Sequence, residues 1–155
     1  EKQMTKVFIM VGVPGAGKST LAKELAEKEH AVILSADNIR EELYGDVNIQ
    51  GDGKKVFGIL YSRIRKTIKS GKNLIIDNTS VDRYSRSKLI EFCTSISDDL
   101  TFYAVVKDVP LEVAKERNAN RVGKVLPVEV LEKFHKKFNF PSIEEGFAEI
   151  ITSTT

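Results

Sequence analysis

The chain has 155 residues, of which 41% are hydrophobic and 30% are charged, and its formal net charge is +2 at pH 7. This length and composition are typical of one folded domain, which we expect to cover residues 1–155, and no apolar run approaches the ~18 residues of a membrane span. A net charge this small gives no argument for nucleic-acid binding by itself.

The cysteine content and the N-terminal sequence indicate a reducing location. Cys93 is the single cysteine, so no internal disulfide can form, and we interpret it as a buried helix residue. The apolar run 7–11 is too short for a signal peptide and continues into a glycine-rich segment. We therefore expect a cytoplasmic protein.

Five nearly continuous apolar runs alternate with helical patterns along the chain. We predict strands at residues 6–11, 31–35, 73–77, 101–106 and 149–152. Apolar residues at helical spacing predict helices that begin at residue 18, that span 56–68, 84–95 and 111–120, and that begin again at 127. Buried strands separated by amphipathic helices are typical of a parallel sheet. The expected fold is a three-layer α/β/α sandwich.

A phosphate-binding pattern follows the first strand, because residues 12–19 read G-V-P-G-A-G-K-S. In such a P-loop, glycines let backbone N–H groups surround phosphate oxygens, and the dipole of the next helix favours the same anion. Lys18 would reach the β- and γ-phosphates, and the Ser19 hydroxyl would bind Mg²⁺. The predicted nucleotide-binding residues are Gly12, Pro14, Gly15, Ala16, Gly17, Lys18, Ser19 and Thr20.

Asp37 and Arg40 follow the second strand and lie three residues apart, so they share one face of a helix. In a phosphoryl-transfer enzyme, Asp37 would accept the proton of an attacking hydroxyl and Arg40 would hold an acceptor phosphate. The structural alternative is a helix-capping aspartate beside a surface arginine.

The third strand ends at Asp77 and Asn78. An aspartate at a strand end beside a P-loop commonly binds Mg²⁺. We name Asp77 with Ser19 as candidate magnesium residues, while the choice between Asp77 and Asn78 stays open. A helix cap is the structural alternative.

Arg117 and Arg121 lie one helical turn apart and precede a short glycine-containing segment. Residues of about 117–127 thus resemble a lid that closes over a nucleotide, with arginines against its phosphates. The alternative role of the arginines is to complement a helix C-terminus.

Basic residues are frequent in the middle of the chain. They are Lys54, Lys55, Arg63, Arg65, Lys66, Lys69 and Lys72. We favour a solvated helix face, with a groove for a nucleic-acid backbone as the alternative. Tyr44, Phe57 and Tyr61 could stack bases there, although at least two of them are expected in the core.

Together these segments resemble the P-loop kinase domain of polynucleotide 5′-hydroxyl kinases of the phage and bacterial end-healing type. The resemblance extends from the P-loop to about residue 138. It rests on the P-loop, the D-x-x-R motif at 37–40, the strand-end aspartate region, D-V-P at 108–110, and R-N-x-x-R with G-x-x-x-P between 117 and 127.

The resemblance implies an ATP-dependent kinase that uses Mg²⁺ and takes the 5′-hydroxyl of DNA or RNA as acceptor. Lys18 and Ser19 would act on ATP and Mg²⁺, and Asp37 would be the general base. Arg40 would hold the neighbouring acceptor phosphate, and Arg121 would contact the transferring phosphoryl group. Arg117 would belong to the nucleotide site.

Two other functions stay open. One is a small-molecule kinase of the same fold that acts on a sugar, nucleoside or antibiotic hydroxyl. The other is a regulatory module that binds a nucleotide without transferring phosphate, although Asp37 would be an unneeded carboxylate in such a module. The sequence has no N/T-K-x-D motif of GTPases and no D-x-D-G-T/V motif of phosphatases.

Overall fold

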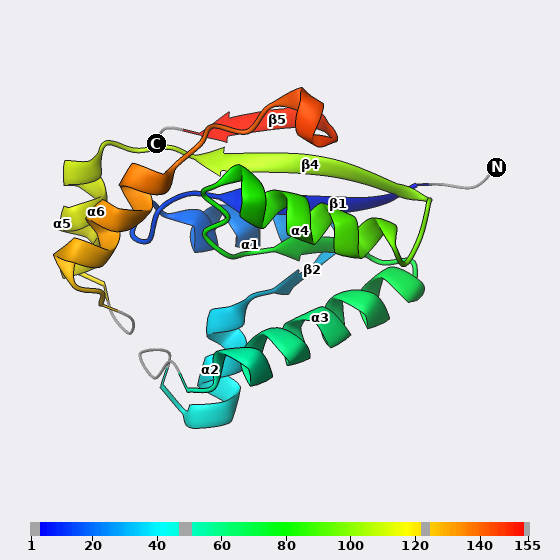
Figure 1. Cartoon of the computed structure of the whole chain (residues 1–155), viewed down its shortest axis with the longest axis horizontal. Coiled ribbons are helices and arrows are strands. Elements are labelled where there is room, and N and C mark those ends of the chain that lie inside the picture. The colour runs from blue at the N-terminus through cyan, green and yellow to red at the C-terminus, as the bar shows by residue number, and fades with distance from the viewer. Residues whose placement is uncertain (1–3, 47–50, 122–124, 154–155) are drawn as a thin grey trace.

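The computed structural model describes residues 4–46, 51–121 and 125–153. Its strands are β1 (Thr5–Val11), β2 (Ala31–Leu34), β3 (Asn73–Ile76), β4 (Leu100–Lys107) and β5 (Phe147–Ser153). Its helices are α1 (Lys18–Glu29), α2 (Ala36–Tyr44), α3 (Gly53–Lys69), α4 (Arg83–Thr94), α5 (Leu111–Ala119) and α6 (Val128–Lys137), with the short 3₁₀ helix η1 (Ile143–Glu145) before β5. All five predicted strands and the predicted helices are present (Figure 1).

The strands form one parallel sheet in the order β2-β3-β1-β4-β5. The central strand β1 pairs with both neighbours, since Ile9 is opposite Ile76 on β3 and Ala104 on β4. The carboxyl ends of the strands therefore meet at one edge, next to α5 and α6 (Figure 1). Ligands in open α/β sheets bind at this edge.

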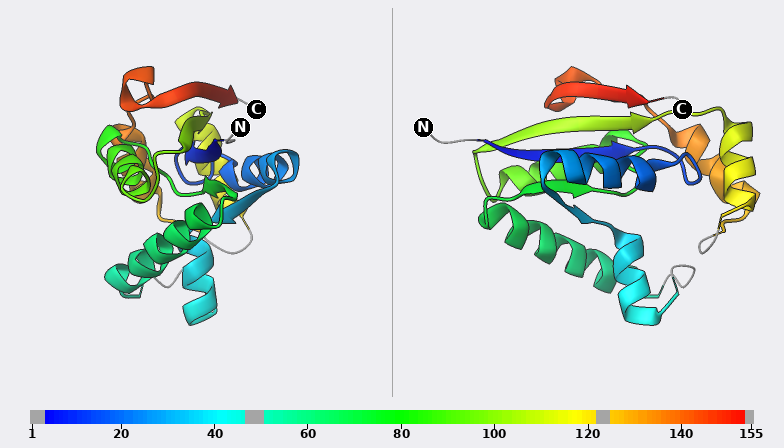
Figure 2. Two further views of the ribbon diagram at one scale, coloured as in Figure 1. Left: turned by 90° about the vertical axis from the view of Figure 1, so that its right-hand side faces the viewer. Right: turned by 180° about the vertical axis from the view of Figure 1, so that it is seen from behind.

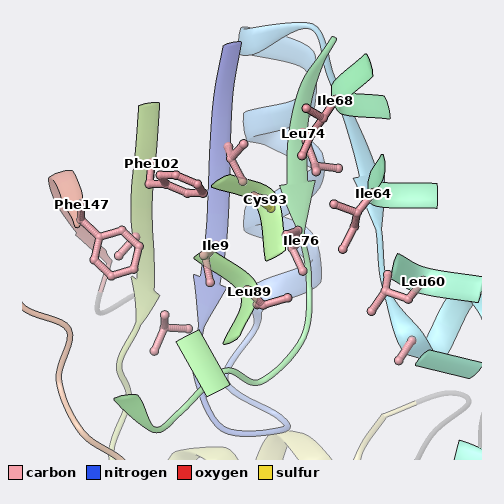
Figure 3. Close-up of a cluster of buried hydrophobic side chains, with 14 of the residues drawn as sticks. Ile9, Leu60, Ile64, Ile68, Leu74, Ile76, Leu89, Cys93, Phe102 and Phe147 are labelled. Atoms are coloured by element: carbon pink, nitrogen blue, oxygen red, sulfur yellow. The ribbon is translucent and has the colours of Figure 1, made fainter. Parts of the chain in front are cut away.

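Helices cover both faces of the sheet, which confirms the three-layer sandwich (Figure 2). On one face, Ala22 of α1 is buried with Phe8, Met10 and Ile75. On the other, the buried stripe of α3 and the buried residues of α4 contact alternate residues of β1, β3 and β4 (Figure 3). Cys93 of α4 lies in this second cluster, and burial raises the pKa of its thiol to about 12.

Side-chain caps explain where the helices begin. The Asp52 carboxylate accepts hydrogen bonds from the N–H groups of Lys54 and Lys55, so α3 begins at Gly53, before the first apolar residue of its stripe. Ser35 caps α2 in the same way and so leaves the predicted second strand. Asp82 caps α4, because its carboxylate accepts a hydrogen bond from the N–H of Ser85.

A separate apolar cluster joins α5 and α6 to the carboxyl edge of the sheet. Ala114 of α5 and Leu131 of α6 are fully buried there against Val13 and Ala16 of the P-loop. The P-loop thus rests on a packed helix pair. None of the helices in the described ranges combines the length and the apolar character that crossing a membrane requires.

Candidate phosphoryl-transfer site

The glycines of the segment 12–17 permit a backbone that other residues would obstruct. Gly15 and Gly17 have φ values of 87° and 100°. A Cβ on Gly15 would lie 2.5 Å from the Ala114 carbonyl oxygen, and one on Gly12 would lie 2.8 Å from that of Lys107. The loop therefore curves tightly against α5 and β4, as a cradle formed by backbone N–H groups must.

The other predicted loop residues occupy positions suited to holding phosphates. Pro14 and Ala16 are buried beneath the curve, while Lys18 opens α1 and is half-buried. Ser19 and Thr20 are exposed in the first turn of that helix. Helix α1 has no acidic residue in its first turn, so the positive end of its dipole, with Lys18 at the first position, favours an anion there.

Ser19 and Asp77 come together although they are 58 residues apart. The Ser19 hydroxyl donates a hydrogen bond of 3.1 Å to Oδ2 of Asp77. Both side chains offer oxygen ligands, which Mg²⁺ prefers, and Mg²⁺ at phosphate sites takes few protein ligands and keeps several waters. The pair therefore fits a magnesium ion that also contacts nucleotide phosphates. In the described residues, no group of three or more His, Cys, Asp or Glu could hold a metal ion by itself.

Asp37 and Arg40 meet on α2, as their spacing predicts. Nη1 of Arg40 lies 2.8 Å from Oδ1 of Asp37. The Arg40 side chain is 12% exposed, whereas that of Asp37 is 41% exposed. Nε of Arg40 is buried and has no hydrogen-bond partner within the described ranges. A buried donor without a partner lowers the stability of the fold. The guanidinium is therefore suited to binding an anionic group of a ligand.

Asn78 and Thr79 connect α2 and the P-loop through the end of β3. Oδ1 of Asn78 accepts a hydrogen bond of 3.1 Å from the N–H of Ala36, at the start of α2. The Thr79 carbonyl accepts one of 3.0 Å from the N–H of Gly12. Asp77 and Asn78 thus have separate contacts: Asp77 faces Ser19, and Asn78 positions the helix that carries Asp37.

Helix α5 approaches the P-loop from the side of β4. Nη1 of Arg117 donates a hydrogen bond of 2.8 Å to the Ala16 carbonyl. The Asn118 side chain hydrogen-bonds both the N–H and the carbonyl of Leu126. Arg121 follows the end of α5 and is half-buried, and its N–H bonds the Asn118 carbonyl. Of the expected lid at 117–127, residues 122–124 lie outside the described residues.

Two buried cations near the site were not anticipated from the sequence. Lys107 is 8% exposed as a whole residue, its Nζ lies 3.2 Å from the Ser153 hydroxyl, and its Cε is 3.3 Å from the position that a Cβ on Gly17 would take. Arg86 is fully buried in an ion pair with Glu145. Arg86 has the same helical spacing as the buried residues Leu89 and Cys93 on α4. An arginine among the buried positions of this helix was the feature of the sequence that could have indicated a buried ion pair.

Arg86 and Glu145 fix the loop after β3. Nη1 of Arg86 donates a hydrogen bond of 3.0 Å to the carbonyl of Ser80, a residue with φ of 43°. Burial raises the pKa of Glu145, but the hydrogen bonds from Arg86 and from the Ser142 N–H outweigh it and hold that pKa below its ordinary value. The charged pair therefore supports a backbone conformation that non-glycine residues rarely adopt.

The basic residues around α3 lie mainly at its surface, and Arg63 is paired. Nη2 of Arg63 lies 2.6 Å from Oε2 of Glu42 on α2. The hydrogen bond from Arg63 lowers the pKa of Glu42. The guanidinium of Arg65 lies 5.4 Å from the ring centroid of Phe92. Among the aromatic residues, Tyr44 and Tyr61 contact the core, as expected for at least two of the three, while Phe57 is 39% exposed.

A family model, AAA_33, described as an AAA domain, matches residues 7–141. The chain belongs to the AAA_33 family. The match extends from within β1 to beyond α6, so the P-loop, the Asp37–Arg40 pair, Asp77 and Arg117 all lie within the AAA_33 domain.

Several relatives and structural neighbours of this AAA_33 domain are named as kinases. A putative bifunctional polynucleotide phosphatase/kinase of Acanthamoeba polyphaga mimivirus is 29% identical, and the alignment covers 96% of this chain but 33% of that protein. An adenylate kinase of Sulfurovum sp. is 30% identical over 81% of this chain and 71% of its own length. A chain of the Pnkp1/Rnl/Hen1 RNA repair complex has a TM-score of 0.74 at 24% identity, with 88% of this chain and 45% of that chain covered. The fold is that of P-loop kinases.

Proposed function

We propose that this AAA_33 domain transfers the γ-phosphoryl group of ATP to the 5′-hydroxyl of a nucleic-acid strand. The observation that carries the proposal is the Asp37–Arg40 pair, held beside the P-loop by Asn78. A carboxylate and a guanidinium at that place supply a base for a hydroxyl and a partner for a phosphate. The likeness to the mimivirus polynucleotide phosphatase/kinase supports a nucleic-acid acceptor.

The transfer needs little covalent chemistry from the protein. The Asp37 carboxylate takes the proton of the acceptor hydroxyl, whose oxygen forms a bond to the γ-phosphorus. The bond between that phosphorus and the oxygen that bridges to the β-phosphate breaks, and ADP leaves. Arg40 holds the acceptor phosphate, Lys18 and Arg121 contact the transferring group, and Arg117 steadies the P-loop. Ser19 and Asp77 would hold Mg²⁺, which neutralises charge on the phosphates.

A small-molecule acceptor is the second candidate, and one observation favours it. The adenylate kinase relative is aligned over most of both chains, whereas the alignment with the polynucleotide phosphatase/kinase covers a third of that protein. An acceptor such as a nucleoside monophosphate would also bring a phosphate to Arg40. The two candidates therefore share the phosphate-donor side and differ in the acceptor.

The deciding experiment offers acceptors in competition. The protein is incubated with γ-labelled ATP and Mg²⁺ in the presence of 5′-hydroxyl DNA, 5′-hydroxyl RNA, adenosine monophosphate and simple sugars. We expect label on an oligonucleotide, and not on the same oligonucleotide already carrying a 5′-phosphate. Label on adenosine monophosphate or a sugar alone would establish the second candidate. Tight ATP binding without transfer to any acceptor would instead indicate a regulatory module.

A further inference from the structure

A pocket opens between α3 and α4 on the β3 side of the P-loop. Phe57 and Tyr61 line it from α3, Tyr84 and Lys88 from α4, and Asn78 and Thr79 form its base at the end of β3. Its volume is about 270 Å³. Sites for drug-sized ligands occupy about 300–1,000 Å³, so this pocket is suited to a single ring system.

The base of the pocket is shared with the proposed transfer site. Thr79 accepts the hydrogen bond from Gly12 of the P-loop, and Asn78 accepts the one from Ala36 at the start of α2. The guanidinium carbon of Arg40 lies 6.0 Å from the ring centroid of Phe57. An acceptor whose phosphate contacts Arg40 would therefore have its nearest ring beside Phe57.

The pocket walls have the chemistry of a nucleobase site. Phe57 and Tyr84 are 39% and 71% exposed, so both can present ring surface to solvent. Nζ of Lys88 lies 5.3 Å from the Tyr84 ring centroid and adds positive charge at the rim. Aromatic faces beside cations are how proteins bind single-stranded nucleic acid, because every base has a face that stacks and every linkage carries a negative charge.

The topology separates this pocket from the nucleotide side. Strand β1 leads into the P-loop, with β3 on one side of it and β4 on the other. Arg117 and α5 approach the P-loop after β4, whereas the pocket follows β3. The backbone at its base is also held rigidly, since buried Arg86 bonds the carbonyl of Ser80 in its left-handed conformation. A strained turn held in this way is typical of a binding site.

We propose that this pocket binds the 5′-terminal base of the acceptor strand, stacked against Tyr84 and Phe57. Lys88 lies at the rim for a backbone phosphate of the same strand. This inference rests on the proposed function and adds the place where the acceptor is recognised. It predicts that the domain distinguishes a strand with a terminal base from one without it.

The test compares two 5′-hydroxyl oligonucleotides that differ only in the first residue, which is either a normal nucleotide or an abasic one. We expect the abasic strand to raise the wild-type KM about tenfold or more. Tyr84→Ala should raise the KM for the normal strand by a similar factor and should hardly affect the abasic strand, because the stacking partner is already absent. Phe57→Leu should act in the same direction. ATP affinity should stay unchanged in both variants.

Phe140→Ala is the matched control, because Phe140 is 51% exposed and lies outside the pocket. Thermal unfolding of each variant checks that the fold is intact. Equal KM values for the two strands, or equal losses on both strands in Tyr84→Ala, would overturn the base site while leaving the kinase function standing. Absence of transfer to any oligonucleotide by the wild type would overturn the proposed function and this inference together.

Discussion

Asp37 and Arg40 form an ion pair one turn apart on α2, with 2.8 Å between Oδ1 and Nη1. The pairing leaves Nε of Arg40 buried without a partner in the described part of the chain. It also keeps the more exposed carboxylate of Asp37 fixed at the carboxyl edge of the sheet. The two side chains therefore have different access to an acceptor, and substitutions at each should affect different kinetic constants.

Asp37→Asn should abolish proton removal while leaving the P-loop unchanged. We expect kcat to fall by about 10²–10⁴-fold, the usual contribution of a general base, with the ATP dissociation constant unaltered. Steady-state kinetics and ATP titration measure the two quantities. Glu41→Gln, at an exposed carboxylate on the same helix, is the control and should retain full activity. Near-normal kcat in Asp37→Asn would refute the base assignment.

Arg40→Gln should act mainly on acceptor binding. Without the guanidinium, the acceptor phosphate loses a charged hydrogen bond, so we expect KM for the acceptor to rise while ATP affinity stays constant. Arg40→Lys should recover only part of the loss, because an ammonium group cannot reproduce the planar guanidinium contacts. Initial rates at varied acceptor concentrations measure the change. An unaltered KM in Arg40→Gln would argue against an acceptor contact.

Asp77→Asn should change the magnesium requirement. The substitution keeps a hydrogen-bond acceptor for Ser19 but removes the negative charge, so half-maximal activity should need more Mg²⁺ than in the wild type. Activity is measured across a magnesium titration at saturating ATP. Asp98→Asn, at an exposed position between α4 and β4, is the control and should leave the titration unchanged. Coincident curves for Asp77→Asn and the wild type would exclude a magnesium role.

Gly15→Ala and Gly58→Ala should have opposite effects on stability. At Gly15 the backbone is left-handed, and the added Cβ would meet the Ala114 carbonyl, so the free energy of unfolding should fall and ATP binding should weaken. Nothing lies within 4 Å of a Cβ at Gly58, inside α3, where alanine should add about 0.5–1 kcal/mol. Urea unfolding and ATP titration distinguish these outcomes. A Gly15→Ala protein that binds ATP normally would show that the loop can relax.

Glu145→Gln should flatten the acid dependence of stability. The pKa of Glu145 is lower in the folded protein than in the unfolded chain, where it is about 4.3. Its contribution is therefore complete above that value and disappears as pH falls through the lower folded pKa. In Glu145→Gln the free energy of unfolding should be lower at pH 7, by up to about 3–5 kcal/mol, and should change less below pH ~5.

Urea unfolding at several pH values measures this difference. Asp82 and Glu42 also have lowered pKa values, because Ser85 and Arg63 donate hydrogen bonds to their carboxylates, and they contribute in the same acid range. Both are present in wild type and variant alike, so they cancel in the comparison. Glu91→Gln changes an exposed carboxylate of α4 and serves as control. Identical pH profiles for Glu145→Gln and wild type would show that the pair has no linked proton.

The helices and strands of this fold could be predicted from the sequence, because the strands are continuous apolar runs and the helices have apolar residues at helical spacing. The order of the strands could not be predicted. It depends on the pairing of β1 with β3 and β4, which are distant from β1 in the sequence. The meeting of Ser19 with Asp77 follows from the convergence of strand ends, whereas no pattern in the sequence indicated which of Asp77 and Asn78 faces Ser19. No pattern in the sequence indicated that Lys107 is buried, because a lysine after an apolar strand normally reaches solvent.

Asn118 gives α5 a fixed connection to the chain eight residues ahead. Its side chain bonds both backbone groups of Leu126, as a neighbouring strand would. The ends of the segment between them are therefore held together regardless of what lies in the middle. Because loop-closure entropy grows slowly with length, about 0.6 kcal/mol per doubling, insertions between residues 121 and 125 should leave α5 and α6 docked. This connection therefore lets the domain change in length here without loss of its fold.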